Sequence, residues 1–163
     1  MNAPRLAALL GLLALGCAGA DVAPPSVFRA PTTGRVARVE VSFSAPDATG
    51  LARAEAGRTA AVVRQSARDW LEHGQRLAAD GPLALEVSLD SLCLRSSLVT
   101  WLFSWAAAPD HLAARVVVRR RGTRVAAFPL RVESALAGFA WRDPEARLER
   151  LARRLGHRVA AEL

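Results

Sequence analysis

The sequence predicts an α+β fold, a two-layer sandwich in which about four strands form a sheet and two helices cover one face of it. Three observations lead to this prediction. Four short stretches alternate apolar and polar residues, as strands with one wet face do. Two longer stretches repeat apolar residues at helical spacing. Their order is β-α-β, then an apolar segment, then β-β-α, which is typical of such a sandwich.

The first strand and the first helix occupy residues 35–79. Alternation between Arg35 and Ser44 predicts the strand, with its apolar positions at Val39, Val41 and Phe43. The helix is predicted from an apolar stripe of Val63, Ala67, Trp70 and Leu71. Gly74 is a candidate C-terminal cap, and Gly81-Pro82 ends the region.

Three more strands are expected between residues 83 and 133. The first alternates from Leu83 to Leu89, and after Ser91 its pattern shifts by one residue, which predicts a bulge or the end of the sheet. Leu112–Arg120 and Arg124–Glu133 follow, joined by a hairpin turn at Arg121-Gly122. Because Pro129 lacks an amide donor, the last strand should be bulged or at an edge of the sheet.

The closing helix has the clearest start signals. Asp143 is a good N-cap, Pro144 fits the first helical position, and Glu145 suits the positive end of the helix dipole. Its apolar stripe consists of Leu148, Leu151, Ala152, Leu155 and Val159. Five arginines are expected to occupy the rest of its surface, namely Arg147, Arg150, Arg153, Arg154 and Arg158.

The N-terminal stretch has the features of a secretory signal peptide. Arg5 precedes an apolar run from Leu6 to Leu15, which at about 10 residues is too short to span a hydrocarbon core of about 30 Å. Leu13-Ala14-Leu15-Gly16-Cys17 resembles the lipobox of bacterial lipoproteins. In that family the signal is removed before the cysteine, whose thiol carries a diacylglyceryl group. The alternative is an ordinary signal followed by an incidental cysteine.

The resemblance implies three parts: a signal peptide at 1–16, a lipidated cysteine with a flexible tether at 17–34, and one α+β domain at 35–163. Prolines 24, 25 and 31 keep the tether extended. It reaches on the order of 20 to 50 Å. Ala18, not Asp, follows Cys17, which by analogy with lipoprotein sorting implies a periplasm-facing outer-membrane lipoprotein, with the inner membrane as the less favoured location. Acyl chains such as palmitate on Cys17 would then be its only non-protein group, and no cofactor is expected.

The chain is basic, with 22 Lys and Arg against 15 Asp and Glu and a net charge of +7. All the basic residues are arginine, which codon bias in a GC-rich genome explains. Positive charge near a membrane attracts anionic head groups or lipopolysaccharide phosphates. Nucleic acid is not an expected partner of an exported protein. With Cys17 lipidated, Cys93 is expected to be a single thiol in the core, a reactive thiol being the alternative.

Residues 98–108 are apolar on every face, whether drawn as a helix or as a strand. Three interpretations remain open: the segment completes the core, contacts a partner protein, or inserts at the bilayer surface, where Trp is favoured. The candidate partner or membrane contacts are Leu98, Trp101, Leu102, Phe103 and Trp105.

No catalytic or metal-binding motif is recognisable. His73, His111 and His157 have no second ligand at metal spacing and are expected on the surface or in loops. The sequence contains no phosphate loop, nucleophile elbow or His-Glu-x-x-His motif. Glu86 and Asp90 are expected to be solvated carboxylates on a strand face. Candidate anion contacts are Arg119, Arg120, Arg121 and Arg124, although a solvated face is the usual role of such runs.

Lipobox, tether, element order and arginine-rich last helix together resemble small bacterial outer-membrane lipoproteins with the sandwich of the LPS-assembly lipoprotein and of curli-secretion and Tol-associated amino-terminal domains. Ala18-Gly19-Ala20 replaces the Gly-Phe that follows the cysteine in the assembly lipoprotein, so the resemblance points to a relative of it. The implied function is a non-catalytic envelope lipoprotein that partners an envelope complex. The alternative is a binding module for lipid or lipopolysaccharide, and an enzyme is not expected.

Overall fold

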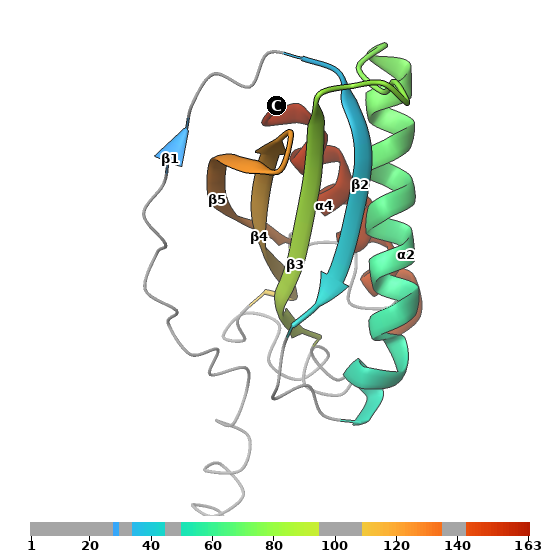
Figure 1. The fold of residues 1–163 in the computed structure, drawn as a ribbon. Coiled ribbons are helices and arrows are strands. Elements are labelled where there is room, and N and C mark those ends of the chain that lie inside the picture. Colours follow the sequence, from blue (N-terminus) through green and yellow to red (C-terminus); the bar gives the residue numbers. More distant parts are fainter. Residues whose placement is uncertain (1–27, 30–33, 45–49, 95–108, 135–142) are drawn as a thin grey trace, which may run out of the picture.

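The computed structural model describes residues 28–29, 34–44, 50–94, 109–134 and 143–163. It contains one mixed sheet in the order β1-β5-β4-β3-β2, with two helices on one face (Figure 1). The elements are β1 (Phe28–Arg29), β2 (Val36–Phe43), α2 (Gly50–His73), β3 (Leu83–Cys93), β4 (His111–Arg120), β5 (Thr123–Glu133) and α4 (Pro144–Ala161). The predicted α+β sandwich and its order of elements are confirmed.

The sheet has one strand more than expected, because β1 falls in the stretch expected to be a tether. Phe28 pairs with Ala127 and Arg29 with Ala126, antiparallel to β5. Signal peptide, Cys17 and the apolar segment 98–108 lie outside the described residues.

Strand pairing explains the irregularities in the sequence pattern. β2 and β3 run parallel and are connected through α2, whereas β3, β4 and β5 are antiparallel neighbours. The β3–β4 register shifts between Leu89 and Ser91, which confirms the predicted bulge. Arg121 and Gly122 have φ values of 51° and 86°, so the tight β4–β5 turn forms where it was predicted.

Pro129 also occupies the kind of position that was predicted. It pairs with Arg115 of β4 on one side. On the other side of β5, β1 pairs only with Ala126 and Ala127, and no other described strand continues along that edge. An amide donor is therefore not needed at Pro129.

The core lies between the sheet and the two helices. Its sheet side consists of the inward residues of β2–β5, including Leu85, Val87, Val116 and Phe128. All five residues of the predicted α4 stripe are buried: Leu148, Leu151, Ala152, Leu155 and Val159. Each large apolar side chain buried there contributes roughly 1.5 to 3 kcal/mol.

The two helices run parallel to each other. Contacts at Arg58–Glu145, Ser66–Arg153 and Arg76–Leu163 all join residues 87 positions apart. The helices cross closely at Gly156, where an added Cβ would lie 2.6 Å from the carbonyl oxygen of Val63 and 2.7 Å from the Cβ of Ser66. Glycine is the only residue that permits this approach.

Three expectations about single residues are wrong. Trp70 is 45% exposed instead of joining the apolar stripe, and it stacks edge-on against His157 with ring centroids 3.9 Å apart. His111 is 6% exposed, because as the first residue of β4 it packs inside the domain. Arg147 is buried, because it pairs with a buried carboxylate. Asp143 is the N-cap residue of α4 as predicted, although its side chain makes no capping hydrogen bond.

Cys93 is buried as expected, but it is not an unpaired thiol. The structure shows it disulfide-bonded. The sequence holds one other cysteine, Cys17, which lies outside the described residues. One sulfur cannot carry both a lipid and a disulfide, so a Cys17–Cys93 bond and lipidation of Cys17 exclude each other.

Candidate functional site

The face of the sheet opposite the helices is the best-defined candidate surface. Strand register arranges its side chains in rows across β2, β3, β4 and β5. One row contains three arginines, in the order Arg38, Ala84, Arg119 and Arg124. The next row contains two carboxylates, in the order Glu40, Glu86, Val117 and Ala127. We call these eight residues the charged rows.

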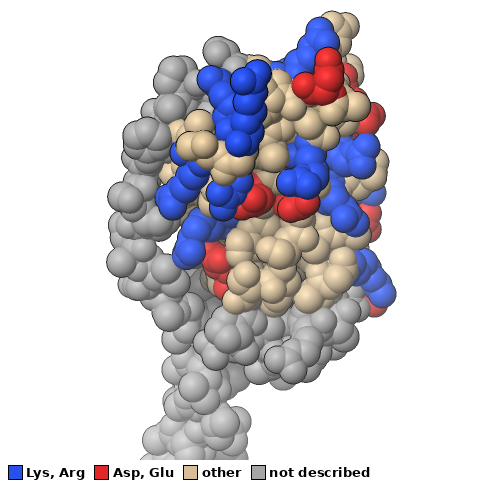
Figure 2. All heavy atoms as spheres, viewed as in Figure 1, with Lys and Arg blue, Asp and Glu red and all other residues tan. Residues whose placement is uncertain are grey.

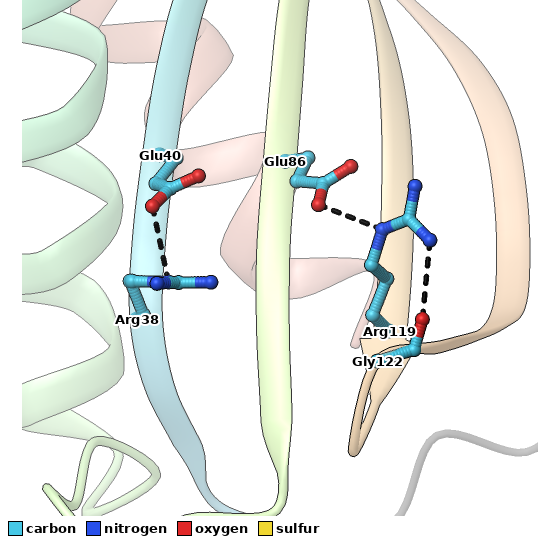
Figure 3. A network of polar contacts seen from close by, with 5 residues as sticks. All are labelled: Arg38, Glu40, Glu86, Arg119 and Gly122. Atoms are coloured by element: carbon cyan, nitrogen blue, oxygen red, sulfur yellow. Dashed lines mark hydrogen bonds and ion pairs between the residues drawn. The ribbon is translucent and has the colours of Figure 1, made fainter.

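Ion pairs connect the charged rows, as Figure 3 shows. Arg38 Nε lies 3.1 Å from Glu40 Oε1, and Arg119 Nε donates to Glu86 Oε1 over 2.7 Å. A second nitrogen of Arg119, Nη1, donates to the carbonyl oxygen of Gly122 at 3.2 Å. Arg119 is therefore held in place by the hairpin itself and by the neighbouring strand.

The four predicted anion contacts gather at the β4–β5 turn. Arg120, Arg121 and Arg124 are exposed, and Arg119 is half-buried. The amide of Arg121 donates to the carbonyl oxygen of Pro82 over 3.2 Å, which ties the turn to the loop before β3. In Figure 2 basic side chains crowd the upper end of this face, the end at which Figure 1 places the turn.

At this end of the face, Arg38, Arg119 and Arg124 on the strands and Arg121 in the turn give four positive charges against the two negative charges of Glu40 and Glu86, an excess of two. Arg120 follows Arg119 on β4 and pairs with the buried Leu83, so it points to the other side of the sheet. Because Arg38 and Arg119 already pair with carboxylates, Arg121 and Arg124 are the side chains best placed to meet an anion from outside.

Toward the other end of β3 the face becomes less charged. The hydroxyl of Ser88 donates to Ser44 Oγ at 2.7 Å. Asp90, expected to be solvated, lies 3.6 Å from Arg115. This end of the face therefore carries hydroxyls and paired charges, whereas the end at the β4–β5 turn carries an excess of arginines.

A buried ion pair holds the start of β4. Arg147 Nη1 lies 3.2 Å from Asp110 Oδ2, and the two side chains are 2% and 1% exposed. The amide of Ser134 donates to the carbonyl oxygen of Asp110 at 3.0 Å. Asp110 follows the apolar segment closely in sequence, so the point at which the chain returns from that segment is fixed to α4 and to the end of β5.

Comparison with known proteins identifies no family. No protein-family description and no curated protein matches the chain. Among solved structures, it is similar to the PelC dodecamer from Paraburkholderia phytofirmans, with 13% identity over 78% of this chain and 85% of that one and a TM-score of 0.49. A leucine-to-methionine variant of that dodecamer gives 12% identity, 78% and 84% coverage and a TM-score of 0.47. At this level of similarity the likeness says nothing about function.

Two classes of site are not found in the part of the chain that the structure describes. Within it, no three His, Cys, Asp or Glu side chains gather closely enough to hold a metal ion. Neither described helix is long and apolar enough to cross a membrane. The candidate partner or membrane contacts Leu98, Trp101, Leu102, Phe103 and Trp105 lie outside the described residues, as does Cys17.

Sequence reasoning missed how the charges pair. It expected Glu86 to be solvated, whereas Glu86 is bound to Arg119 on the next strand. The turn motif Arg121-Gly122 indicates from the sequence how β4 and β5 pair. No comparable motif indicates the register of β3 against β4, on which the Glu86–Arg119 pair depends. For the Asp110–Arg147 pair the sequence carries no signal at all, because it joins a loop to a helix that lies beyond β5.

Proposed function

We propose that the chain is a membrane-anchored, non-catalytic envelope lipoprotein that acts as an interaction or assembly partner of an envelope complex, on the periplasmic side of the outer membrane. The observation that carries this proposal is the lipobox-like Leu13-Ala14-Leu15-Gly16-Cys17 behind its apolar run. Each buried CH₂ of an acyl chain contributes about 0.8 kcal/mol, so two or three chains on Cys17 hold the protein at a membrane.

The charged rows support a partner role. A sheet fixes the spacing of its side chains, and the ion pairs at 3.1 Å and 2.7 Å further restrict Arg38 and Arg119. Such a surface selects a partner by charge complementarity more than by apolar contact. Its arginine excess favours a partner with an acidic surface.

The state of Cys17 decides the first part of the proposal, because the disulfide that the structure gives Cys93 competes with a lipid for the one other sulfur in the sequence. The proposal assigns Cys17 to the lipid and therefore requires Cys93 to be a buried thiol in the mature protein. Intact-mass measurement of the chain isolated from envelopes, under non-reducing conditions, should show loss of residues 1–16 and addition of diacylglyceryl and acyl groups at Cys17. The variant Cys17→Ser should appear in the soluble periplasmic fraction. A Cys17–Cys93 disulfide without lipid, or membrane retention of Cys17→Ser, would contradict the proposal.

The β4–β5 turn favours a second candidate, a binding module for an amphipathic or anionic ligand such as lipid or lipopolysaccharide. Arg119, Arg120, Arg121 and Arg124 would contact phosphates, as guanidinium groups commonly do. The apolar segment with Trp101 and Trp105 would contact the acyl chains.

Affinity capture from solubilised envelopes separates the two candidates. Mass spectrometry of the bound material should show one stoichiometric protein if the chain is a docking partner, and enriched lipid alone if it is a lipid-binding module. The double variant Arg121→Ser/Arg124→Ser should reduce the amount of protein or lipid that is captured, whichever of the two binds at this turn. Arg153→Ser/Arg158→Ser, an equal loss of charge on the exposed surface of α4, is the matched control.

A further inference from the structure

The outer edge of β2 carries backbone groups that no other described strand pairs. In the described part of the chain β2 is the last strand on its side of the sheet, and β3 is its only strand neighbour. The amide of Ser44 donates to the carbonyl oxygen of Leu89, whose register partner is Phe43. Because backbone directions alternate along a strand, Val39, Val41 and Phe43 point their N–H and C=O groups away from β3. We call these backbone groups the free edge.

Among the described residues, the chain itself closes only the beginning of this edge. The amide of Val36 donates to the carbonyl oxygen of Arg76 over 2.7 Å, and the amide of Ala78 donates to the carbonyl oxygen of Val36 over 2.9 Å. From the described part of the chain, no hydrogen bond reaches the free edge further along β2. Unpaired strand edges of this kind are templates for pairing with another chain.

One side of α2 runs along the free edge. This helix packs on β2, whereas α4 packs on β4 and β5, and Figure 1 shows α2 along the outer side of β2. Its contacts to α4 come from Arg58, Ser66 and Trp70. At about 3.6 residues per turn, Arg64 and Arg68 lie on the opposite side of α2, which is the side beyond β2.

These two arginines make the surface beside the free edge positive. Arg64 and Arg68 are both exposed, and within the described structure neither side chain has a hydrogen bond or an ion pair. A strand added to β2 would hold its inward side chains over this side of α2. Carboxylates at those positions would pair with the guanidinium groups, which bind carboxylates by charge-assisted hydrogen bonds.

The same charges disfavour a second copy of this chain as the added strand. Two copies that paired through β2 about a two-fold axis would bring both α2 helices to one junction. Arg64 and Arg68 of each copy would then face those of the other, and like charges at short range repel. The free edge therefore suits a different chain, with acidic side chains.

We propose that the free edge binds an extended acidic segment of a partner protein by strand addition. The backbone of the segment pairs with Val39, Val41 and Phe43, and its inward carboxylates contact Arg64 and Arg68. This inference rests on the proposed partner role, for which it names the docking edge and the chemistry of the partner, and not on the lipid anchor. Envelope capture and intact mass test the proposed function, whereas titrations with defined peptides test the edge, so either can fail without the other.

A short peptide of alternating valine and glutamate is the probe. Fluorescence anisotropy with the full chain in detergent solution should show saturable one-to-one binding, with a Kd at least tenfold lower than that of the matching valine–lysine peptide. Methylation of the amide nitrogens along one edge of the peptide strand should raise the Kd at least tenfold, and methylation along its other edge should change it less than twofold. No saturable binding of the glutamate peptide, or equal effects of the two methylation patterns, would overturn the proposal.

Val41→Pro removes an edge donor without removing a bond between β2 and β3. The amide of Val41 points away from β3, so proline is compatible with the strand pairing at this position. The variant should raise the Kd of the glutamate peptide at least tenfold. Val41→Ala, which also shortens the side chain but keeps the amide, should change the Kd less than twofold. Equal affinities of the two variants would show that the peptide does not pair with β2.

A charge reversal keeps the test decisive if Val41→Pro does not fold. Arg64→Glu/Arg68→Glu changes two exposed side chains; it should raise the Kd of the glutamate peptide at least tenfold and lower that of the lysine peptide. Arg153→Glu/Arg158→Glu, exposed on α4, is the matched control and should change neither Kd more than twofold. Equal effects of the two reversals would contradict the proposal. A dimer of the chain that forms without peptide and is lost in Arg64→Glu/Arg68→Glu would assign the edge to a second copy and overturn it.

Discussion

Glu86 and Arg119, on the open face of the sheet, lie 2.7 Å apart with more than a third of each side chain exposed. Asp110 and Arg147, on the helical side, lie 3.2 Å apart and are 1% and 2% exposed. The shorter contact is the one that matters less for stability. An exposed pair contributes about 0 to 1 kcal/mol because water and salt screen it, whereas loss of one partner of a buried pair leaves an uncompensated charge in the interior.

Arg147→Met gives the largest effect. Removing the guanidinium leaves Asp110 buried without its cation, so the free energy of unfolding should fall by about 3 to 5 kcal/mol in urea denaturation. The double variant Asp110→Asn/Arg147→Met removes both charges, and its free energy of unfolding should fall less than that of Arg147→Met alone. A loss under 1 kcal/mol in Arg147→Met would show that water reaches this pair and that the contrast between the two faces is wrong.

Gly156→Ala probes the tightness of the helical side without changing charge. The added methyl group meets backbone and Cβ atoms of α2, so α4 must shift, at a cost of about 1 to 3 kcal/mol in thermal or urea unfolding. Gly57→Ala is the matched control, because nothing lies within 4 Å of its added Cβ. That variant should gain about 0.5 to 1 kcal/mol from helix propensity. Equal changes in the two variants would argue against a close crossing at Gly156.

Glu86→Gln gives the smallest effect, at most about 1 kcal/mol. A double-mutant cycle with Arg119→Gln should measure a coupling of about 0.2 to 1 kcal/mol between the two side chains, and 1 M NaCl should reduce it. The stability defect of Arg147→Met should change much less with salt. A coupling energy above about 2 kcal/mol that does not change with salt would show that the Glu86–Arg119 pair behaves like a buried ion pair.

Regular patterns in the sequence predicted most of the fold. Alternation located β2 to β5, the shift after Ser91 predicted the bulge, and the stripe through Leu148 and Leu155 predicted the buried side of α4. Periodicity reports which residues share a face, but not what packs against that face. For this reason Trp70 was placed in the core and Arg147 on the surface.

Much less of the candidate sites could be predicted. The arginines of the β4–β5 turn were recognised because they are consecutive in sequence. The pairing of Glu86 with Arg119 depends on strand register, which the sequence does not show. The contact between α2 and α4 joins residues 87 positions apart, such as Arg58 and Glu145, and no local pattern predicts it.

The position of α4 in the chain affects when the domain can fold. This helix packs on β4 and β5 and against α2, so the part of the apolar sheet face over β4 and β5 stays uncovered until residues beyond 143 arrive. Contacts of such long sequence separation form late, because the loop entropy must be lost before they contribute. A chain exported in an unfolded state, as the proposed lipoprotein is, would thus stay competent for threading through a membrane until nearly all of it has emerged.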